Sequence, residues 1–273
     1  MGYGYPLQAY SRRETIGLTV ASGVLVSGSA TGGVYGSLTT IGTTGFAYDG
    51  LFVVIQSVSG RRWRLTLTAN TNSTDEPIAT DFYYDNNETS DGPGPSFWLP
   101  IFVPSGATLK LKAAGGSSGS GTLRASIIGY QGDGNLIGPF TGVVGLTDFG
   151  STTSGCDVAN PITLTGTTPT GWFTMQAATP AAVSAISLCI NTMGQAITSG
   201  DLLRLDLGYG TAGNEIATGI SLTETITSGN GTWGLIQNIP IVLPAGLRLA
   251  MRATLSAADT THTVGLVGWG LVR

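Results

Sequence analysis

The hydrophobic residues of this chain stand in short runs in which apolar and polar positions alternate. Examples are Leu65-Thr66-Leu67-Thr68, Leu109-Lys110-Leu111-Lys112 and Ile220-Ser221-Leu222-Thr223. A period of two is typical of a strand that buries one face. Clusters of Gly, Ser, Thr and Asn between the runs favour turns, and apolar residues at helical spacing are not sustained for a dozen residues anywhere. We therefore predict an all-β protein.

One segment of the chain occurs twice at an offset of 140 residues. The sequence PIFVPSG at 100–106 returns as PIVLPAG at 240–246, and LKLKA at 109–113 returns as LAMRA at 249–253. Weaker matches continue in the same order along most of both halves, which indicates a duplicated unit. Each unit is long enough for about eight short antiparallel strands around its own core.

The duplication predicts two tandem antiparallel β-sandwich domains of jelly-roll-like form. We place an N-terminal arm at 1–15, the first sandwich at 16–132 and the second at 137–273. The alternation within each repeat predicts that Leu109 and Leu249 are core positions. The prolines on either side of the short apolar segment suit an edge strand, because proline donates no hydrogen bond to a neighbour.

Composition and charge exclude several classes of function. Only 10% of the residues are charged, the net charge is −4, and the chain has two lysines. It therefore offers no basic surface for nucleic acid. No apolar stretch reaches the roughly 20 residues of a spanning helix, so we expect no membrane partner. The N-terminus lacks the pattern of a secretory signal, which favours assembly in a cytoplasm.

The chain offers little to a catalytic mechanism. Its one histidine, His262, lies in a predicted strand and aligns with Leu123 of the first repeat, which favours a surface position over a catalytic role. No nucleophile elbow, metalloprotease motif or zinc spacing occurs, so we expect no enzyme and no cofactor. Cys156 and Cys189 are too few for a disulfide framework, and either two reduced thiols or a single bridge fits the sequence.

One acidic cluster stands out between residues 75 and 91. Six of the 16 acidic residues fall in this stretch, together with two asparagines. The simpler interpretation is a solvated, polar long loop. Calcium binding is the alternative, because Ca²⁺ prefers clustered carboxylate and amide oxygens, with Asp81, Asp85, Glu88 and Asp91 as its ligands.

Aromatic residues near this cluster are candidates for partner binding. Tyr84 and Trp98 could stack on a sugar or pack at an interface, and nothing in the sequence separates the two. The acids and aromatics together also fit a glycosidase, the least favoured of these alternatives. Tyr3 and Tyr5 lie in the apolar N-terminal arm, which we expect to clasp a neighbouring subunit.

The second repeat resembles small all-β virion proteins of tailed bacteriophages. The segment RLDLGYGTAGNE at 204–215, the proline-flanked turn within 239–249 and the strand at 264–269 carry this resemblance, and the first repeat fits more loosely. It implies a non-enzymatic structural protein, present in multiple copies on the head as decoration or in the tail or fibre. Its partners would be copies of itself and other virion proteins, with assembly in the host cytoplasm. The alternative is a receptor- or glycan-binding module of a tail fibre.

Overall fold

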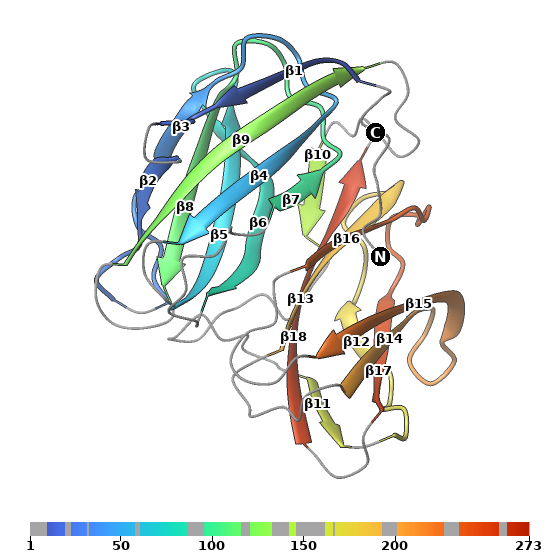
Figure 1. The fold of residues 1–273 in the computed structure, drawn as a ribbon. Helices are drawn as coiled ribbons and strands as arrows, with labels where there is room; N and C mark the ends of the chain where they lie inside the picture. Colours follow the sequence, from blue (N-terminus) through green and yellow to red (C-terminus); the bar gives the residue numbers. More distant parts are fainter. Residues whose placement is uncertain are drawn as a thin grey trace.

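The computed structural model is an all-β molecule made of two sandwiches that lie side by side (Figure 1). It describes residues 10–19, 23–31, 33–57, 61–86, 96–115, 121–132, 142–145, 162–165, 167–192, 201–226, 235–256 and 261–272. Within these ranges every regular element is a β-strand. Over the same ranges, no helix has the length and hydrophobicity to cross a membrane.

Nine strands build the first sandwich and nine build the second, counted over the described residues. The first set is β1 (Tyr10–Ile16), β2 (Val24–Ser27), β3 (Thr39–Thr43), β4 (Gly50–Ser57), β5 (Arg61–Asn70), β6 (Asp75–Asn86), β7 (Ser96–Leu99), β8 (Thr108–Gly115) and β9 (Thr122–Gly132). The second set is β10 (Gly142–Gly145), β11 (Ile162–Thr165), β12 (Phe173–Gln176), β13 (Ala185–Thr192), β14 (Asp201–Tyr209), β15 (Ile216–Ile226), β16 (Leu235–Ile239), β17 (Leu249–Leu255) and β18 (Thr261–Val272).

The strand order confirms the predicted duplication of a jelly-roll-like sandwich. In the first unit one sheet runs β1-β9-β4-β7 and the other β3-β8-β5-β6. In the second unit the sheets run β10-β18-β13-β16 and β12-β17-β14-β15, which is the same order nine strands later. All these pairings are antiparallel. β2 and β11 pair with β9 and β18, so the first strand of each jelly roll is in two pieces.

The predicted arm at 1–15 is too long, because residues 10–15 belong to strand β1. This strand is polar, so side-chain alternation does not reveal it. Its backbone pairs with β9, and its side chains bind the loop before β4. The Glu14 carboxylate accepts hydrogen bonds of 2.7 Å from the Tyr48 hydroxyl and the Gly45 amide, and the Arg12 guanidinium lies 4.2 Å over the Phe46 ring.

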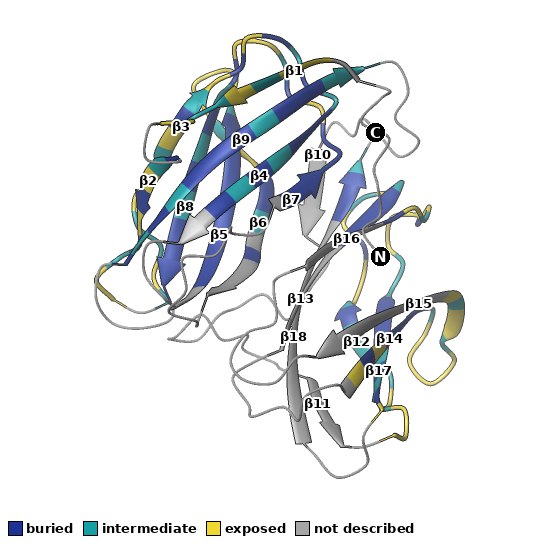
Figure 2. Ribbon diagram, in the orientation of Figure 1, coloured by how far each residue is buried: buried dark blue, intermediate teal, exposed yellow. Residues whose placement is uncertain are grey.

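Alternating burial fills the space between the two sheets of each sandwich. Leu109 and Leu111 on β8 are fully buried, as are their counterparts Leu249 and Met251 on β17, which confirms the predicted core positions. Figure 2 shows buried residues along the central strands of both units. The buried apolar side chains of the two sandwiches belong to one connected cluster.

The repeated proline-flanked segment forms a loop that four hydrogen bonds hold in place. In the first unit the Thr44 hydroxyl donates to the Pro104 carbonyl (2.8 Å) and accepts from the Ala107 amide (3.1 Å). The Thr44 amide donates to the Ala107 carbonyl, and its carbonyl accepts from the Gly106 amide. In the second unit Thr179 makes the same four bonds to Pro244, Leu247 and Gly246.

The edge strand predicted between the prolines lies just ahead of them instead. β7 and β16 end their sheets and stop at Leu99 and Ile239, one residue before the first proline of each loop. Between the prolines the backbone makes isolated bridges, which include those from Val103 to Tyr48 and from Leu243 to Val183.

Replacing Thr44 or Thr179 with valine is expected to lower the free energy of unfolding by about 1–3 kcal/mol at each site, because each buried hydroxyl serves as both donor and acceptor. Urea denaturation of the purified variants measures this loss. Thr40→Val is the matched control, since Thr40 is exposed on β3 and its change should stay within about 0.5 kcal/mol. If both variants lose no more unfolding free energy than Thr40→Val does, the Thr44 and Thr179 hydroxyls do not hold the loops in place.

Candidate functional site

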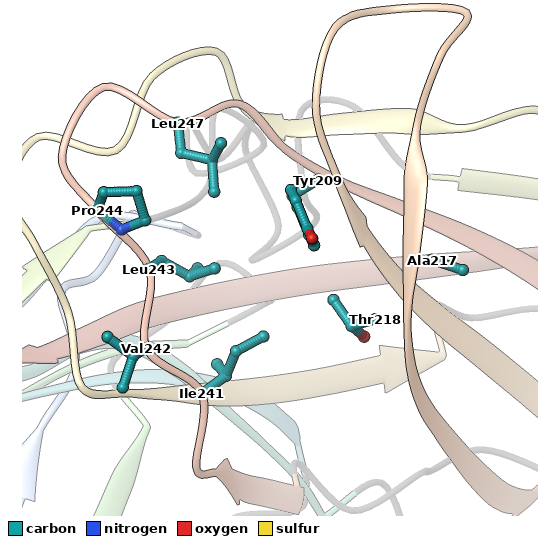
Figure 3. A pocket seen from close by; sticks show the side chains of 8 residues that line it. All are labelled: Tyr209, Ala217, Thr218, Ile241, Val242, Leu243, Pro244 and Leu247. Atoms are coloured by element: carbon teal, nitrogen blue, oxygen red, sulfur yellow. The ribbon is translucent and has the colours of Figure 1, made fainter.

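The second sandwich carries an open surface cavity of about 410 Å³. It is formed by the end of β14, the start of β15 and the loop that follows β16. Its lining side chains are Tyr209, Ala217, Thr218, Ile241, Val242, Leu243, Pro244 and Leu247, arranged around the opening in Figure 3. All of them except Tyr209 and Thr218 are apolar.

The duplicated loop holds one wall of this cavity rigidly. Leu243 is fixed by its backbone bridge to Val183, and the Thr179 hydrogen bonds hold Pro244 and Leu247. On the opposite wall the Thr218 hydroxyl donates to the Leu207 carbonyl (2.9 Å), so this polar group is satisfied within the protein. Val242, which lines the cavity, is 80% exposed, and Ile216, which precedes the lining residue Ala217 on β15, is 56% exposed.

Two of the equivalent positions of the first sandwich are buried. Strand pairing sets Ile216 opposite Tyr209 as it sets Glu76 opposite Ala69, so Thr218 corresponds to Ile78. Ile78 and Ile101 are buried, whereas Thr218 and Ile241 are partly exposed. Phe102, the equivalent of Val242, is 38% exposed, so both repeats keep an exposed apolar side chain at this position of the loop.

An ion pair beside the cavity links the β14–β15 turn to the start of β17 and to β12. Arg248 donates to Glu215 (2.8 Å), to the Gly210 carbonyl and to the Thr174 hydroxyl, and both charged side chains are largely buried. Desolvation of the Glu215 carboxylate is outweighed by hydrogen bonds from Arg248 and backbone amides, which hold its pKa below the ordinary value. This carboxylate is thus a charged structural partner of Arg248.

The first sandwich has a counterpart at the same place. Asp75 at the start of β6 binds Lys110 (2.8 Å) and accepts a hydrogen bond from Asn70. The hydrogen bonds from Lys110 and then Asn70 lower the pKa of the Asp75 carboxyl. The role of this acidic residue is therefore structural.

Cations and aromatic rings cover the outer face of the second sheet in each sandwich. In the first unit Arg64 and Lys112 lie over the Tyr35 ring at 4.6 and 4.4 Å. In the second unit Arg252 lies 4.9 Å over Trp172, whose six-membered ring lies directly against Gly208. Each of these partly exposed rings therefore has at least one cation over it.

One carboxylate on this face is also neutralised. Asp206 is buried and binds Arg204 at 2.8 Å and Arg252 at 2.9 Å. Both of its oxygens are engaged by guanidinium groups, so Asp206 is a structural partner of these two arginines.

The predicted binding residue Trp98 lies inside the protein, which corrects its assignment to a partner surface. It is only 6% exposed and packs against Phe52 and Tyr130 with ring centroids 4.8 and 5.9 Å away. The sequence placed it near polar residues, but β7 brings it next to the aromatic residues of β4 and β9.

The predicted polar loop is a strand over most of its length. Asp75–Asn86 forms β6, so the loop interpretation is wrong for this part of the acidic cluster. Asp81, Asp85 and Tyr84 lie on β6, but their side chains are outside the described part, as are Glu88, Asp91, Tyr3 and Tyr5 altogether. The residues that the structure describes contain no group of three or more His, Cys, Asp or Glu side chains suited to a metal ion.

His262 lies on β18, as predicted, and pairs with Leu164. Its alignment with Leu123 is wrong by two residues. Leu123 pairs with Ser57, the last residue of β4, and Val264 pairs with Thr192, the last residue of the equivalent strand β13. Val264 is therefore the counterpart of Leu123. Cys156 and the side chains of Cys189 and His262 lie outside the described part.

Sequence reasoning missed the cavity. The available signal was a difference between the repeats. The second repeat has Thr218 where the first has Ile78, whereas the loop after β16 keeps its aliphatic residues. The similar letters of residues 78–80 and 216–218 align Ile78 with Ile216, two residues from its partner Thr218, and hide this difference.

The fold defines the class of this protein as a tandem jelly-roll β-sandwich protein with an apolar surface cavity in its second unit. No protein-family model matches the chain, and no curated protein matches it. Several solved structures resemble it over most of its length. N-glycanase F (PNGase F) matches with a TM-score of 0.44 and 10% identity, over 95% of this chain and 96% of that chain.

Two further matches are weaker. The tandem CBM22-1-CBM22-2 domain of Paenibacillus barcinonensis Xyn10C matches with a TM-score of 0.24 and 12% identity, over 96% of this chain and 91% of that one. The infectious bursal disease virus VP2 subviral particle matches with a TM-score of 0.27 and 10% identity, over 96% and 71%. Likenesses this distant say nothing about what this chain binds or does.

Proposed function

We propose that this chain is a non-enzymatic structural protein of a bacteriophage virion, where multiple copies pack on the head or in the tail or fibre assembly. The observation that carries the proposal is the apolar lining of the cavity together with the exposed aliphatic side chains beside it. Val242 and Ile216 are large aliphatic side chains held out on a rigid scaffold, which is typical of a surface that packs against another protein.

The charged groups of the described part support a structural role. Asp75, Asp206 and Glu215 each bind a lysine or arginine at 2.8–2.9 Å. General acid–base chemistry needs a carboxylate whose proton can leave and return near the working pH, and ion pairing opposes this. These carboxylates serve the fold.

The proposal that the protein belongs to a phage particle comes from the sequence. The second repeat resembles small all-β virion proteins, and the low charge suits a molecule with extensive protein contacts. Copies of this chain and other virion proteins would be its partners, with assembly in the host cytoplasm.

Mass spectrometry of gradient-purified particles from the phage that encodes this chain tests the proposal. We expect the chain in a fixed number of copies per particle, comparable with known structural subunits. Its absence from particles, with abundant protein in the infected lysate, would contradict a virion role.

A receptor- or glycan-binding role has less support in the described residues. Stacking on a sugar needs an open aromatic face, but Trp98 is buried and two cations, Arg64 and Lys112, lie over the Tyr35 ring. Glycan-array binding that is lost in Tyr84→Ala, but kept in Trp172→Ala, would favour this role instead.

A further inference from the structure

β1 is the end strand of the sheet β1-β9-β4-β7, and among the described strands it pairs with β9 alone (Figure 1). Its described side chains run from Arg12 to Ile16, and none of them is buried. Ile16 packs against the core but is only partly buried. A strand that buries so little apolar surface opens at a low cost in free energy. β1 can therefore leave the sheet while the core of the sandwich stays closed.

The chain between β1 and β2 is longer than the sheet requires. Ile16 pairs with Ile127 of β9, and Val24, eight residues later, pairs with Ala125, only two residues further along the same strand. At about 3.3 Å per residue, these eight steps can span about 26 Å when extended. β1 can therefore reach beyond its own sheet while β2 stays in place.

The place that β1 occupies selects a strand with its sequence. The buried Tyr48 hydroxyl and the Gly45 amide both donate to the Glu14 carboxylate at 2.7 Å, and Arg12 lies 4.2 Å over the Phe46 ring. A buried hydroxyl is costly to leave without an acceptor. A strand that takes this place must therefore bring a carboxylate, with a cation two residues before it. The β1 strand of another copy of this chain meets both conditions.

We propose that β1 is exchanged between copies of this chain. In the assembled state, β1 of one copy pairs with β9 of the next, and its Glu14 binds Tyr48 and Gly45 of that copy. The proposal rests on the proposed structural function, which brings several copies into contact. It names the element through which those copies join.

Concentration decides between the exchanged and the unexchanged form, because both make the same strand contacts. In dilute solution each copy keeps its own β1, which is always close to its place on the sheet. Where copies are held side by side, the neighbour's strand is equally close, and exchange becomes competitive. Reciprocal exchange closes a dimer, whereas serial exchange joins copies into a ring or a chain.

A disulfide between two chains tests the exchange directly. Thr15 of β1 and Ile128 of β9 stand opposite each other, so their Cα atoms lie about 4.5–5.5 Å apart, which a disulfide can span. One chain carries Thr15→Cys and the other Ile128→Cys, and both carry Cys156→Ser and Cys189→Ser to remove the native thiols. The two are refolded together from urea at high concentration, so that slow opening of β1 does not limit exchange, and are then oxidised.

We expect the mixed disulfide dimer in roughly tenfold or greater excess over a control mixture, because strand pairing holds the two thiols at a high effective concentration. The control replaces Thr15→Cys with Thr211→Cys, a matched change at an exposed residue of the β14–β15 turn. Mass spectrometry identifies the dimer, and urea unfolding midpoints confirm that every variant folds.

A chain that carries both Thr15→Cys and Ile128→Cys provides an independent readout. Oxidised in dilute solution, it has β1 locked on its own sheet and cannot exchange it. By sedimentation velocity we expect the locked chain to keep the monomer mass at concentrations where the same chain, when reduced, associates.

Two outcomes would overturn the exchange. One is a mixed dimer no more abundant than in the control mixture, and the other is a locked chain that associates as strongly as the reduced one. Either would leave the virion role intact if the chain is still found in purified particles. Absence of the chain from particles would contradict that role, whereas an abundant mixed dimer would still establish the exchange of β1.

Discussion

Replacing Leu109 or Leu249 with alanine is expected to lower the free energy of unfolding by about 2–5 kcal/mol. Both side chains are fully buried at equivalent positions of β8 and β17, each a strand with a neighbour on both sides. The loss combines the transfer of the leucine side chain with the cavity that rigid neighbouring strands cannot close.

Urea unfolding with a shared m-value measures both losses, and Leu18→Ala is the matched control. Leu18 is 66% exposed, so its truncation should change stability by no more than about 0.5 kcal/mol. Because the cores of the two sandwiches form one connected cluster, we expect Leu109→Ala and Leu249→Ala to shift the same transition. A cost near zero at both sites would contradict the strand register described above.

Alternation and duplication were sufficient to predict the general fold. The pattern at 109–112 correctly assigned Leu109 and Leu111 to the core, because a strand that is solvated on one face must alternate. The offset of 140 residues predicted two equivalent sandwiches, since the same turn and strand pattern folds in the same way twice.

The parts that the sequence could not predict depend on backbone pairing and on distant neighbours. β1 is polar, and only its pairing with β9 and the Glu14 hydrogen bonds show that it belongs to the sheet. The burial of Trp98 depends on β7 lying beside β4, a contact between residues more than 40 positions apart.

A match of similar letters explains why the candidate site was missed. β15 pairs with β14 through an irregularity between Asp206 and Gly208, and β6 pairs with β5 through two smaller ones. Both arrangements add two residues to the outer strand, so the offset of 140 continues through β6 and β15 and pairs Ile78 with Thr218. The similar letters of residues 78–80 and 216–218 suggest a different alignment, which hides this correspondence and with it the cavity.

The second large effect is expected at Gly129, where alanine should destabilise the protein by about 3 kcal/mol, the upper end of overpacking. A Cβ at this position would lie 2.2 Å from the Tyr48 ring. The ring has nowhere to move: it is fully buried, packs edge-on against Phe46 at 5.4 Å, and donates a hydrogen bond to Glu14. Burial and then Glu14 raise the Tyr48 pKa, so the hydroxyl stays protonated as the donor across the ordinary pH range.

A double-mutant cycle with Tyr48→Leu separates this clash from a general intolerance of Gly129 to substitution. If the ring is the obstacle, Gly129→Ala should cost much less in the Tyr48→Leu background than in the wild type. Gly171→Ala is the matched control, because a Cβ there meets nothing within 4 Å, and its unfolding free energy should change by only a few tenths of a kcal/mol. Equal costs of Gly129→Ala in both backgrounds would mean that the Tyr48 ring does not set the limit. A smaller cost of Gly129→Ala in the Tyr48→Leu background would show that glycine is required at position 129 of β9 because the Tyr48 ring occupies the space of a Cβ.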